Sequence, residues 1–262
     1  MGVGTSDALI IKYSKMLRGM VDMDIFLFAL FMTLANIIQG ITGFAGAPLA
    51  MPPCIAVVGI TNAKSAITFI FWFTSLVVTL KNLKKIDYKH LGIMLAFMIP
   101  GVVAGMWLFK QLPLNSLMLI YGVVIILIAV KKLFFPAKKP LPGFMGYVVL
   151  VLAGLMQGMF TSGGPFMALY AADAIKDKTV FRPTVTTVWT VLNSYMVVQM
   201  YADGMYSAMS YKLIAFTVIP VFVAIYIGRI LNGKMKQDTF LKLVYCLLIV
   251  SGSLLIYNYI KL

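Results

Sequence analysis

The 262-residue sequence contains no glutamate, one histidine and two cysteines. Without glutamate it cannot contain the His-Glu-x-x-His zinc motif, and His90 stands in a basic segment, away from any serine nucleophile such as Ser162. No two aspartates face each other on apolar segments, as an intramembrane aspartyl mechanism would require. Cys54 and Cys246 lie in apolar runs without metal-ligand spacing. We therefore expect no enzyme, no cofactor and no metal site.

Charge is also scarce, because 11% of the residues are charged whereas 61% are hydrophobic. A helix needs about 20 apolar residues to cross a membrane. Two apolar pieces, Pro48–Ile60 and Pro165–Ile175, are too short to do so as straight helices. The sequence predicts an all-α, polytopic membrane protein with the spans Ile25–Gly43, Ser65–Leu80, Leu91–Phe109, Ser116–Val130, Phe144–Phe160, Thr184–Tyr201, Leu213–Ile230 and Leu241–Ile260.

The formal net charge of +14 would suggest nucleic acid as the partner of a soluble protein. Here the basic residues cluster in short segments between the spans, where they set orientation and meet anionic lipid headgroups. The first span follows more than twenty mostly polar residues and has no cleavage pattern, so we interpret it as a span rather than a signal peptide. We predict the lipid bilayer as a partner, with a basic N-terminal tail at its surface (Lys12, Lys15 and Arg18).

The chain contains an internal repeat. A shift of 118 residues aligns Gln39-Gly40 with Gln157-Gly158, and Lys64 with Arg182. Further along, Pro100 matches Pro220 and Gly105 matches Gly228. The predicted organisation is a polar tail (1–23), a first membrane half (24–135), a linker (136–142) and a second membrane half (143–262). Each half has about four hydrophobic segments.

The orientation of the two halves depends on the short apolar pieces. If each piece returns to the side from which its preceding span entered, the halves are inverted, and 15 of the 22 Lys and Arg share one face. If each broken stretch crosses once, the halves are parallel and 13 share one face. The positive-inside rule therefore favours inverted repeats.

Both short pieces follow glycine-rich breaks, Gly40–Pro48 and Gly158–Pro165. Broken backbone is stable in a membrane only within protein or beside a water-filled cavity. Glycine allows close backbone approach, and the amino end of the following helix attracts anions. We predict a substrate cavity here, whereas Gly101 and Gly105 are interpreted as helix packing. The cavity residues predicted from the breaks are Gln39, Gly43, Gly46, Gln157, Ser162, Gly163 and Gly164.

Four further side chains are candidate substrate ligands. Lys64 and Arg182 match in the repeat, and each is either a headgroup-level cation or an anion ligand at the cavity rim. Thr186 and Asn193 share a polar stripe with Thr190 that forms either the cavity wall or helix–helix contacts.

Asp173 is the acid inside an apolar run, which makes it a candidate for proton coupling. The alternative is an ion pair with Lys176 at a helix end.

The paired motifs Gly40-Ile-Thr-Gly43-Phe-Ala-Gly46-Ala-Pro48 and Gly158-Met-Phe-Thr-Ser-Gly163-Gly164-Pro165, each followed by a basic residue, resemble those of the TauE/SafE sulfite exporter family. The first motif has Ala45 and Ala47 where denser glycine is common in the family. The resemblance implies a secondary transporter that exports small sulfur-containing anions, such as sulfite or organosulfonates, across a cell (inner) membrane. A passive anion channel and a non-transporting scaffold are the alternatives, and the sequence leaves open whether the chain forms a homo-oligomer.

Overall fold

The computed structural model describes residues 4–134, 143–231 and scattered positions between 246 and 260. The predicted linker 136–142 and half of the predicted span Leu241–Ile260 lie outside the described residues, as do the side chains of Lys12, Lys15 and Arg18. Within the described ranges the elements are α1 (Gly4–Thr42), α2 (Gly46–Val58), α3 (Ile60–Leu80), the 3₁₀ helix η1 (Leu83–Lys85), α4 (Tyr88–Gln111), α5 (Leu114–Phe134), α6 (Gly143–Phe160), α7 (Gly164–Ala174), α8 (Lys178–Ala202) and α9 (Ala208–Leu231).

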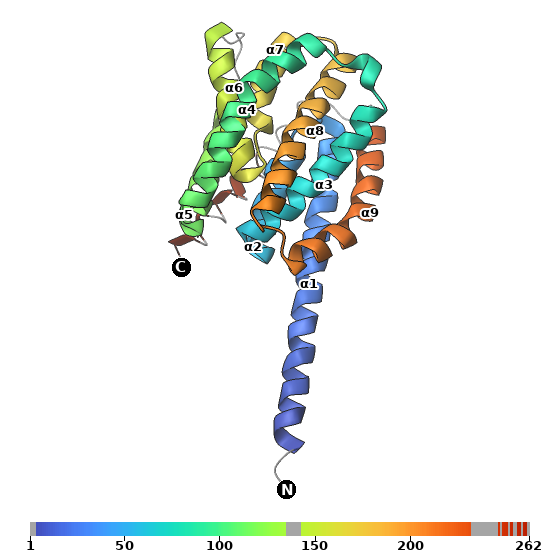
Figure 1. Cartoon of the computed structure of the whole chain (residues 1–262), viewed down its shortest axis with the longest axis vertical. Helices are drawn as coiled ribbons and strands as arrows, with labels where there is room; N and C mark the ends of the chain where they lie inside the picture. Colours follow the sequence, from blue (N-terminus) through green and yellow to red (C-terminus); the bar gives the residue numbers. More distant parts are fainter. Residues whose placement is uncertain are drawn as a thin grey trace.

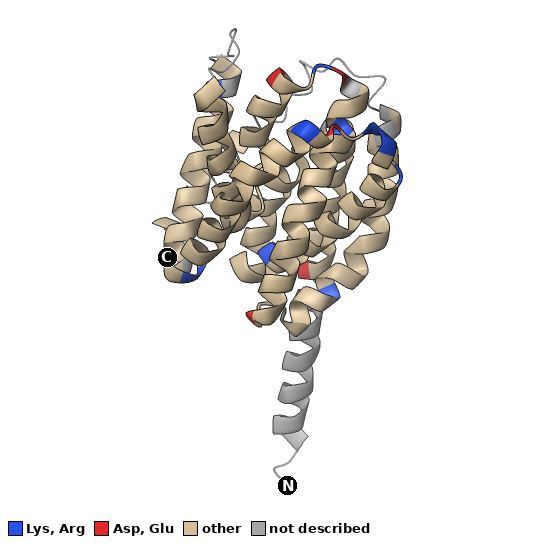
Figure 2. Ribbon diagram, turned by 45° about the horizontal axis from the view of Figure 1, so that its top comes forward, with Lys and Arg blue, Asp and Glu red and all other residues tan. Residues whose placement is uncertain are grey.

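The helices run roughly side by side along the long axis of the molecule, and the amino-terminal part of α1 projects beyond the bundle (Figure 1). Five described segments are long and apolar enough to cross a membrane: Asp22–Ile41, Ile60–Leu80, Tyr88–Gln111, Gly143–Phe160 and Ala208–Gly228. Charged residues of the described chain lie mostly near the two ends of the bundle, with an uncharged band between them (Figure 2). The protein is therefore an all-α, multi-pass membrane protein, as the sequence predicts.

The two predicted helix breaks are present and are shorter than the sequence suggests. Residues 43–45 separate α1 from α2, and residues 161–163 separate α6 from α7. Each short helix packs against the helix that precedes it, so α1 with α2 and α6 with α7 form two hairpins. Pro48 and Pro165 lie in the first turns of α2 and α7, where a missing N–H leaves no hydrogen bond unmade.

Glycines bring the helices of the two sequence halves into backbone contact. On α1 and α9, a Cβ on Gly40 would lie 3.0 Å from the Cα of Gly228. On α6 and α4, a Cβ on Gly105 would lie 3.1 Å from the Cα of Gly158. Gly101 likewise packs on the backbone of α6, which confirms the packing role predicted for Gly101 and Gly105.

The direction of the helices follows from the hydrogen bonds between α3 and α8. Thr79, near the end of α3, bonds to Thr190 at 2.9 Å, whereas Trp72, about two turns earlier, bonds to Ser194 at 2.8 Å. Residue numbers fall on α3 as they rise on α8, so the two helices are antiparallel.

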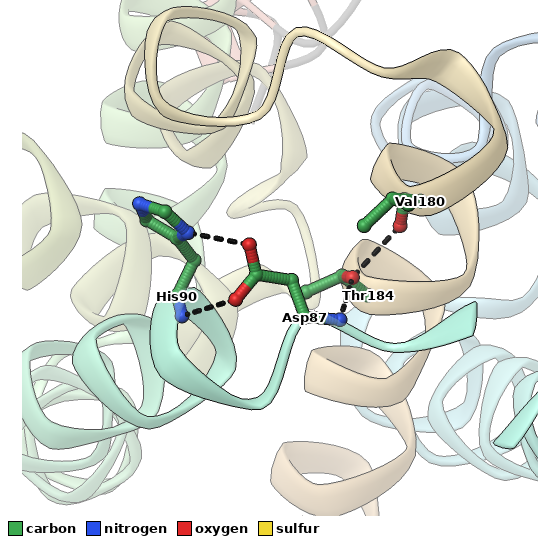
Figure 3. Close-up of polar contacts among 4 residues, drawn as sticks. All are labelled: Asp87, His90, Val180 and Thr184. Atoms are coloured by element: carbon green, nitrogen blue, oxygen red, sulfur yellow. Dashed lines mark hydrogen bonds and ion pairs between the residues drawn. The ribbon is translucent and has the colours of Figure 1, made fainter. Parts of the chain in front are cut away.

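Asp87 fixes the start of α4 against α8 (Figure 3). Its carboxylate accepts the His90 N–H at 3.0 Å and faces the His90 ring at 2.7 Å, while its backbone N–H donates to the Thr184 hydroxyl at 2.9 Å. These bonds from His90, the backbone N–H first, lower the pKa of Asp87. A lowered carboxyl pKa stabilises the fold above the unfolded-state pKa, and this contribution is lost as the pH falls through the folded-state value.

The glycine contacts predict opposite effects for two alanine substitutions. Gly154→Ala places a methyl group against the Met98 carbonyl. A methyl group on Gly92, in α4, would instead point into open space. Overpacking costs about 1–3 kcal/mol, while alanine at an open helical position stabilises by up to about 1 kcal/mol. We expect Gly154→Ala to lower the thermal unfolding midpoint in detergent and Gly92→Ala to keep or raise it; equal midpoints for both variants would contradict this packing.

Candidate functional site

A cavity lies between the two helix breaks and the facing sides of α3 and α8. The space open to the centres of water molecules is about 40 Å³. One water needs about 10–15 Å³ by this measure, so the cavity has room for about three waters or a small anion. Its wall is formed by Gln39, Gly40, Gly43, Phe44, Ala47, Phe71, Thr74, Ser75, Val78, Gln157, Thr161, Gly164, Arg182, Thr186, Trp189, Asn193 and Ile225.

Seven of the eleven predicted ligand residues line this single cavity. They come from both halves of the chain, and the polar ones sit on α1, α6 and α8. The seven are Gln39, Gly43, Gln157, Gly164, Arg182, Thr186 and Asn193.

The side chain of Gln39 closes the first break. Its Oε1 accepts the N–H of Gly46 at 2.8 Å, and its Nε2 donates to the carbonyl of Gly43 at 3.0 Å. The N–H of Gly43 donates to the backbone carbonyl of Gln39 at 2.8 Å. One glutamine therefore satisfies backbone groups on both sides of the turn, in a region where bulk water cannot do so.

Gln157 closes the second break in the same way but also reaches α8. Its Oε1 accepts the N–H of Gly163 at 3.1 Å, and its Nε2 donates to Oδ1 of Asn193 at 2.8 Å. The predicted anion-binding amides of Gly46 and Gly163 are thus already bonded to glutamine side chains. These two amides are therefore not available to a solute. The side chains on α8 are the other candidate ligands at the cavity.

Each break passes through one residue with left-handed backbone. Gly43 has φ +86° and Thr161 has φ +54°, and the two are 118 residues apart, as in the repeat. A β-branched residue rarely adopts this conformation, and such strain costs on the order of 1–3 kcal/mol. The Thr161 hydroxyl hydrogen-bonds to that of Thr68 at 2.7 Å, which ties the strained turn to α3.

The polar stripe of α8 serves both roles that the sequence left open. Arg182, Thr186 and Asn193 line the cavity. Thr190, on the same helix, instead joins α8 to α3 through Thr79. Trp189 completes the cavity side of the stripe; it is 6% exposed, and its Nε1 has no hydrogen-bond partner among the described residues.

The other predicted residues lie away from the cavity wall. The Lys64 side chain is 1% exposed, with its Nζ 3.4 Å from the centre of the Phe109 ring, which is a cation–π contact. The Ser162 hydroxyl bonds to Tyr121 of α5 at 2.7 Å, and Gly46 and Gly163 make the amide contacts to glutamine already given. Asp173 is partly exposed, with Lys176 at 3.8 Å, which favours the helix-end ion pair.

Four polar residues of the cavity wall lie outside the predicted ligand set: Thr74, Ser75, Thr161 and Trp189. Trp189 follows Thr186 by three residues and precedes Asn193 by four, so helical spacing alone places it on the same stripe. Thr161 matches Gly43 in the repeat, which was the available signal for its special backbone.

These features define a class: a polytopic membrane protein in which two broken helices and one polar helix face enclose a small cavity. The sulfite exporter TauE/SafE family model matches residues 27–255, and the chain belongs to this family. It is therefore a membrane transporter rather than an enzyme. It is similar to the "Probable inner membrane transporter protein TsaS" of Comamonas testosteroni, with 22% identity over 174 residues covering 65% of this chain and 73% of the relative. No solved structure matches it.

Replacement of Gln157 tests its role in closing the second break. Gln157→Leu removes the acceptor of the Gly163 N–H and the donor to Asn193, and each buried group left unpaired costs about 1–3 kcal/mol. We expect a clearly lower thermal midpoint in detergent. Gln199→Leu is the control, because the Gln199 side chain bonds to Asp203 at an exposed position. Similar losses in both variants would mean that Gln157 does not hold the break.

Proposed function

We propose that this protein is a secondary carrier that exports small sulfur oxyanions, such as sulfite or an organosulfonate, across the inner membrane by alternating access. The observation that carries the proposal is the cavity between the two helix breaks, with Arg182 on its wall. The family to which the chain belongs and the inner membrane transporter that it resembles support the substrate class and the location.

The electrostatics of the cavity favour an anion. Arg182 is the charged residue among those that line it, within the part of the chain that the structure describes. A guanidinium can hold two oxygens of a sulfite or sulfonate at once. The amino end of α7 begins at Gly164, also on the wall, and its positive dipole end adds to the attraction.

The arrangement of the helices supports inverted repeats. α3 and α8, which are equivalent in the repeat, are antiparallel, as judged from their hydrogen bonds. Equivalent helices also make equivalent contacts across the two halves. In the repeat α1 corresponds to α6, and α4 corresponds to α9; α1 packs on α9, and α6 packs on α4. Inverted repeats are a common basis of alternating access, because the two halves can exchange conformations around a central site.

The two equivalent cations are in unequal surroundings, which is expected for one state of such a cycle. Arg182 lies on the cavity wall. Lys64 is buried under Phe109 at the opposite end of α3, and the neighbouring Lys110 forms an ion pair with Asp203. We propose that the Lys64 end is closed here and that it opens when the Arg182 end closes.

Transport by reconstituted vesicles tests the carrier. We expect the wild-type protein to accumulate sulfite against its gradient when a pH or voltage difference is imposed, because a carrier couples movement to that difference. Arg182→Ala should weaken sulfite binding about 10- to 100-fold, as expected for loss of a charged hydrogen bond. Arg182→Lys, which keeps the charge and loses the planar fork, should be intermediate.

The control is Lys176→Ala, because Lys176 is exposed and lies in the connection after α7, which ends at Ala174. This variant should transport as the wild type does. Flux that only dissipates gradients would identify a channel, and absence of any oxyanion flux would identify a scaffold.

Asp173→Asn separates the coupling hypothesis from the ion-pair interpretation. Because Asp173 is partly exposed and lies near Lys176, we expect transport by Asp173→Asn to keep the pH profile of the wild type. The measurement is initial sulfite uptake across a series of pH values. Loss of the pH dependence in this variant would restore Asp173 as the proton-coupling group.

A further inference from the structure

Four residues of α8 that line the cavity lie on one helical stripe. Arg182, Thr186, Trp189 and Asn193 are spaced by four, three and four residues, which places them above one another on the same face. Three of them carry N–H or guanidinium donors. The stripe therefore presents donors to the cavity along about three turns of α8.

The indole of Trp189 is a buried donor without a protein acceptor. The residue is 6% exposed, and its Nε1 has no hydrogen-bond partner among the described residues. Trp72 shows the usual arrangement, because its Nε1 donates to the Ser194 hydroxyl at 2.8 Å. Buried polar atoms are nearly always bonded in native proteins. Trp189 lines the cavity, so an acceptor held there is a candidate partner for its indole N–H.

Asn193 is oriented so that it too can offer donors. Its Oδ1 accepts from Gln157, which is itself fixed by the Gly163 N–H. The part of the Asn193 amide left for a ligand is the NH₂ group, which only donates. By contrast, the Thr186 hydroxyl already donates to the Arg182 carbonyl at 2.8 Å.

We propose that the Trp189 indole N–H and the Asn193 NH₂ group select the substrate as a fully ionised oxyanion without a cationic group. This inference rests on the proposed function and specifies its substrate class. An oxyanion accepts hydrogen bonds at every oxygen and so satisfies both donors together with Arg182. A zwitterion such as taurine brings an ammonium group, and the described residues of the wall include no carboxylate to receive it.

The test compares two Trp→Phe variants of the full chain in detergent. Trp189→Phe keeps an aromatic ring and removes the indole N–H of a residue that lines the cavity, whereas Trp72→Phe makes the same change at a residue that is not on the wall. The affinity for sulfite is obtained from the thermal midpoint at increasing sulfite concentration. We expect binding about tenfold or more weaker in Trp189→Phe and unchanged in Trp72→Phe, because a hydrogen bond to a charged ligand is lost only in the first.

A second measurement leaves Trp189 intact. The chain has three tryptophans, so the double variant Trp72→Phe/Trp107→Phe makes Trp189 the sole tryptophan fluorophore. Sulfite should change its emission over the same concentration range that raises the thermal midpoint, and taurine should do neither.

The outcomes separate this inference from the proposed function. If no oxyanion stabilises the wild type, the proposed function fails. If sulfite stabilises the wild type but Trp189→Phe binds it equally well, or Trp189 emission does not respond, the role of Trp189 is overturned. If taurine binds as tightly as sulfite, the assignment of a substrate without a cationic group is wrong.

Discussion

The backbone of two interrupted helices must find hydrogen-bond partners inside a membrane protein, and the rest of the site depends on how this is achieved. In each half a glutamine one turn before the break folds its side chain over the loop and accepts a hydrogen bond from an amide at the far end of that loop, Gly46 or Gly163. The breaks are thereby stable without water and short, at three residues each. Because the glutamines occupy these amides, the proposed recognition of an anion rests mainly on the side chains of α8.

The two halves use the same device with one difference that makes the site asymmetric. Gln39 is bonded entirely within its own loop, whereas Gln157 is shared between its loop and Asn193. The position that matches Asn193 in the first half is Ser75, whose hydroxyl bonds to its own helix at Trp72. A short hydroxyl cannot replace the longer amide, so the second half has an extra link between break and polar stripe.

Much of the fold was predictable from the sequence because membrane spans and glycine-rich breaks have strong local signals. Gln39, Gln157, Arg182 and Asn193, which the sequence analysis selected, all line one cavity, and their role as substrate ligands stays a prediction. The burial of Lys64 beneath Phe109 was not predictable, because a lysine just before a span is equally consistent with a cation at the level of the lipid headgroups. The unpaired nitrogen of Trp189 could not be predicted from the sequence either. An aromatic residue on an apolar helix usually packs in the hydrophobic core, and its hydrogen-bond partners depend on tertiary packing.

The exchange of partners between the halves also constrains how the chain is assembled. α1 packs on α9, which is synthesised well over a hundred residues later, while α6 packs on the earlier α4. The first hairpin leaves the ribosome long before its packing partner exists, and its glycine face at Gly40 stays uncovered until Gly228 has been made. The contacts of α1 with α9 and of α3 with α8 therefore form only after most of the polypeptide has been made.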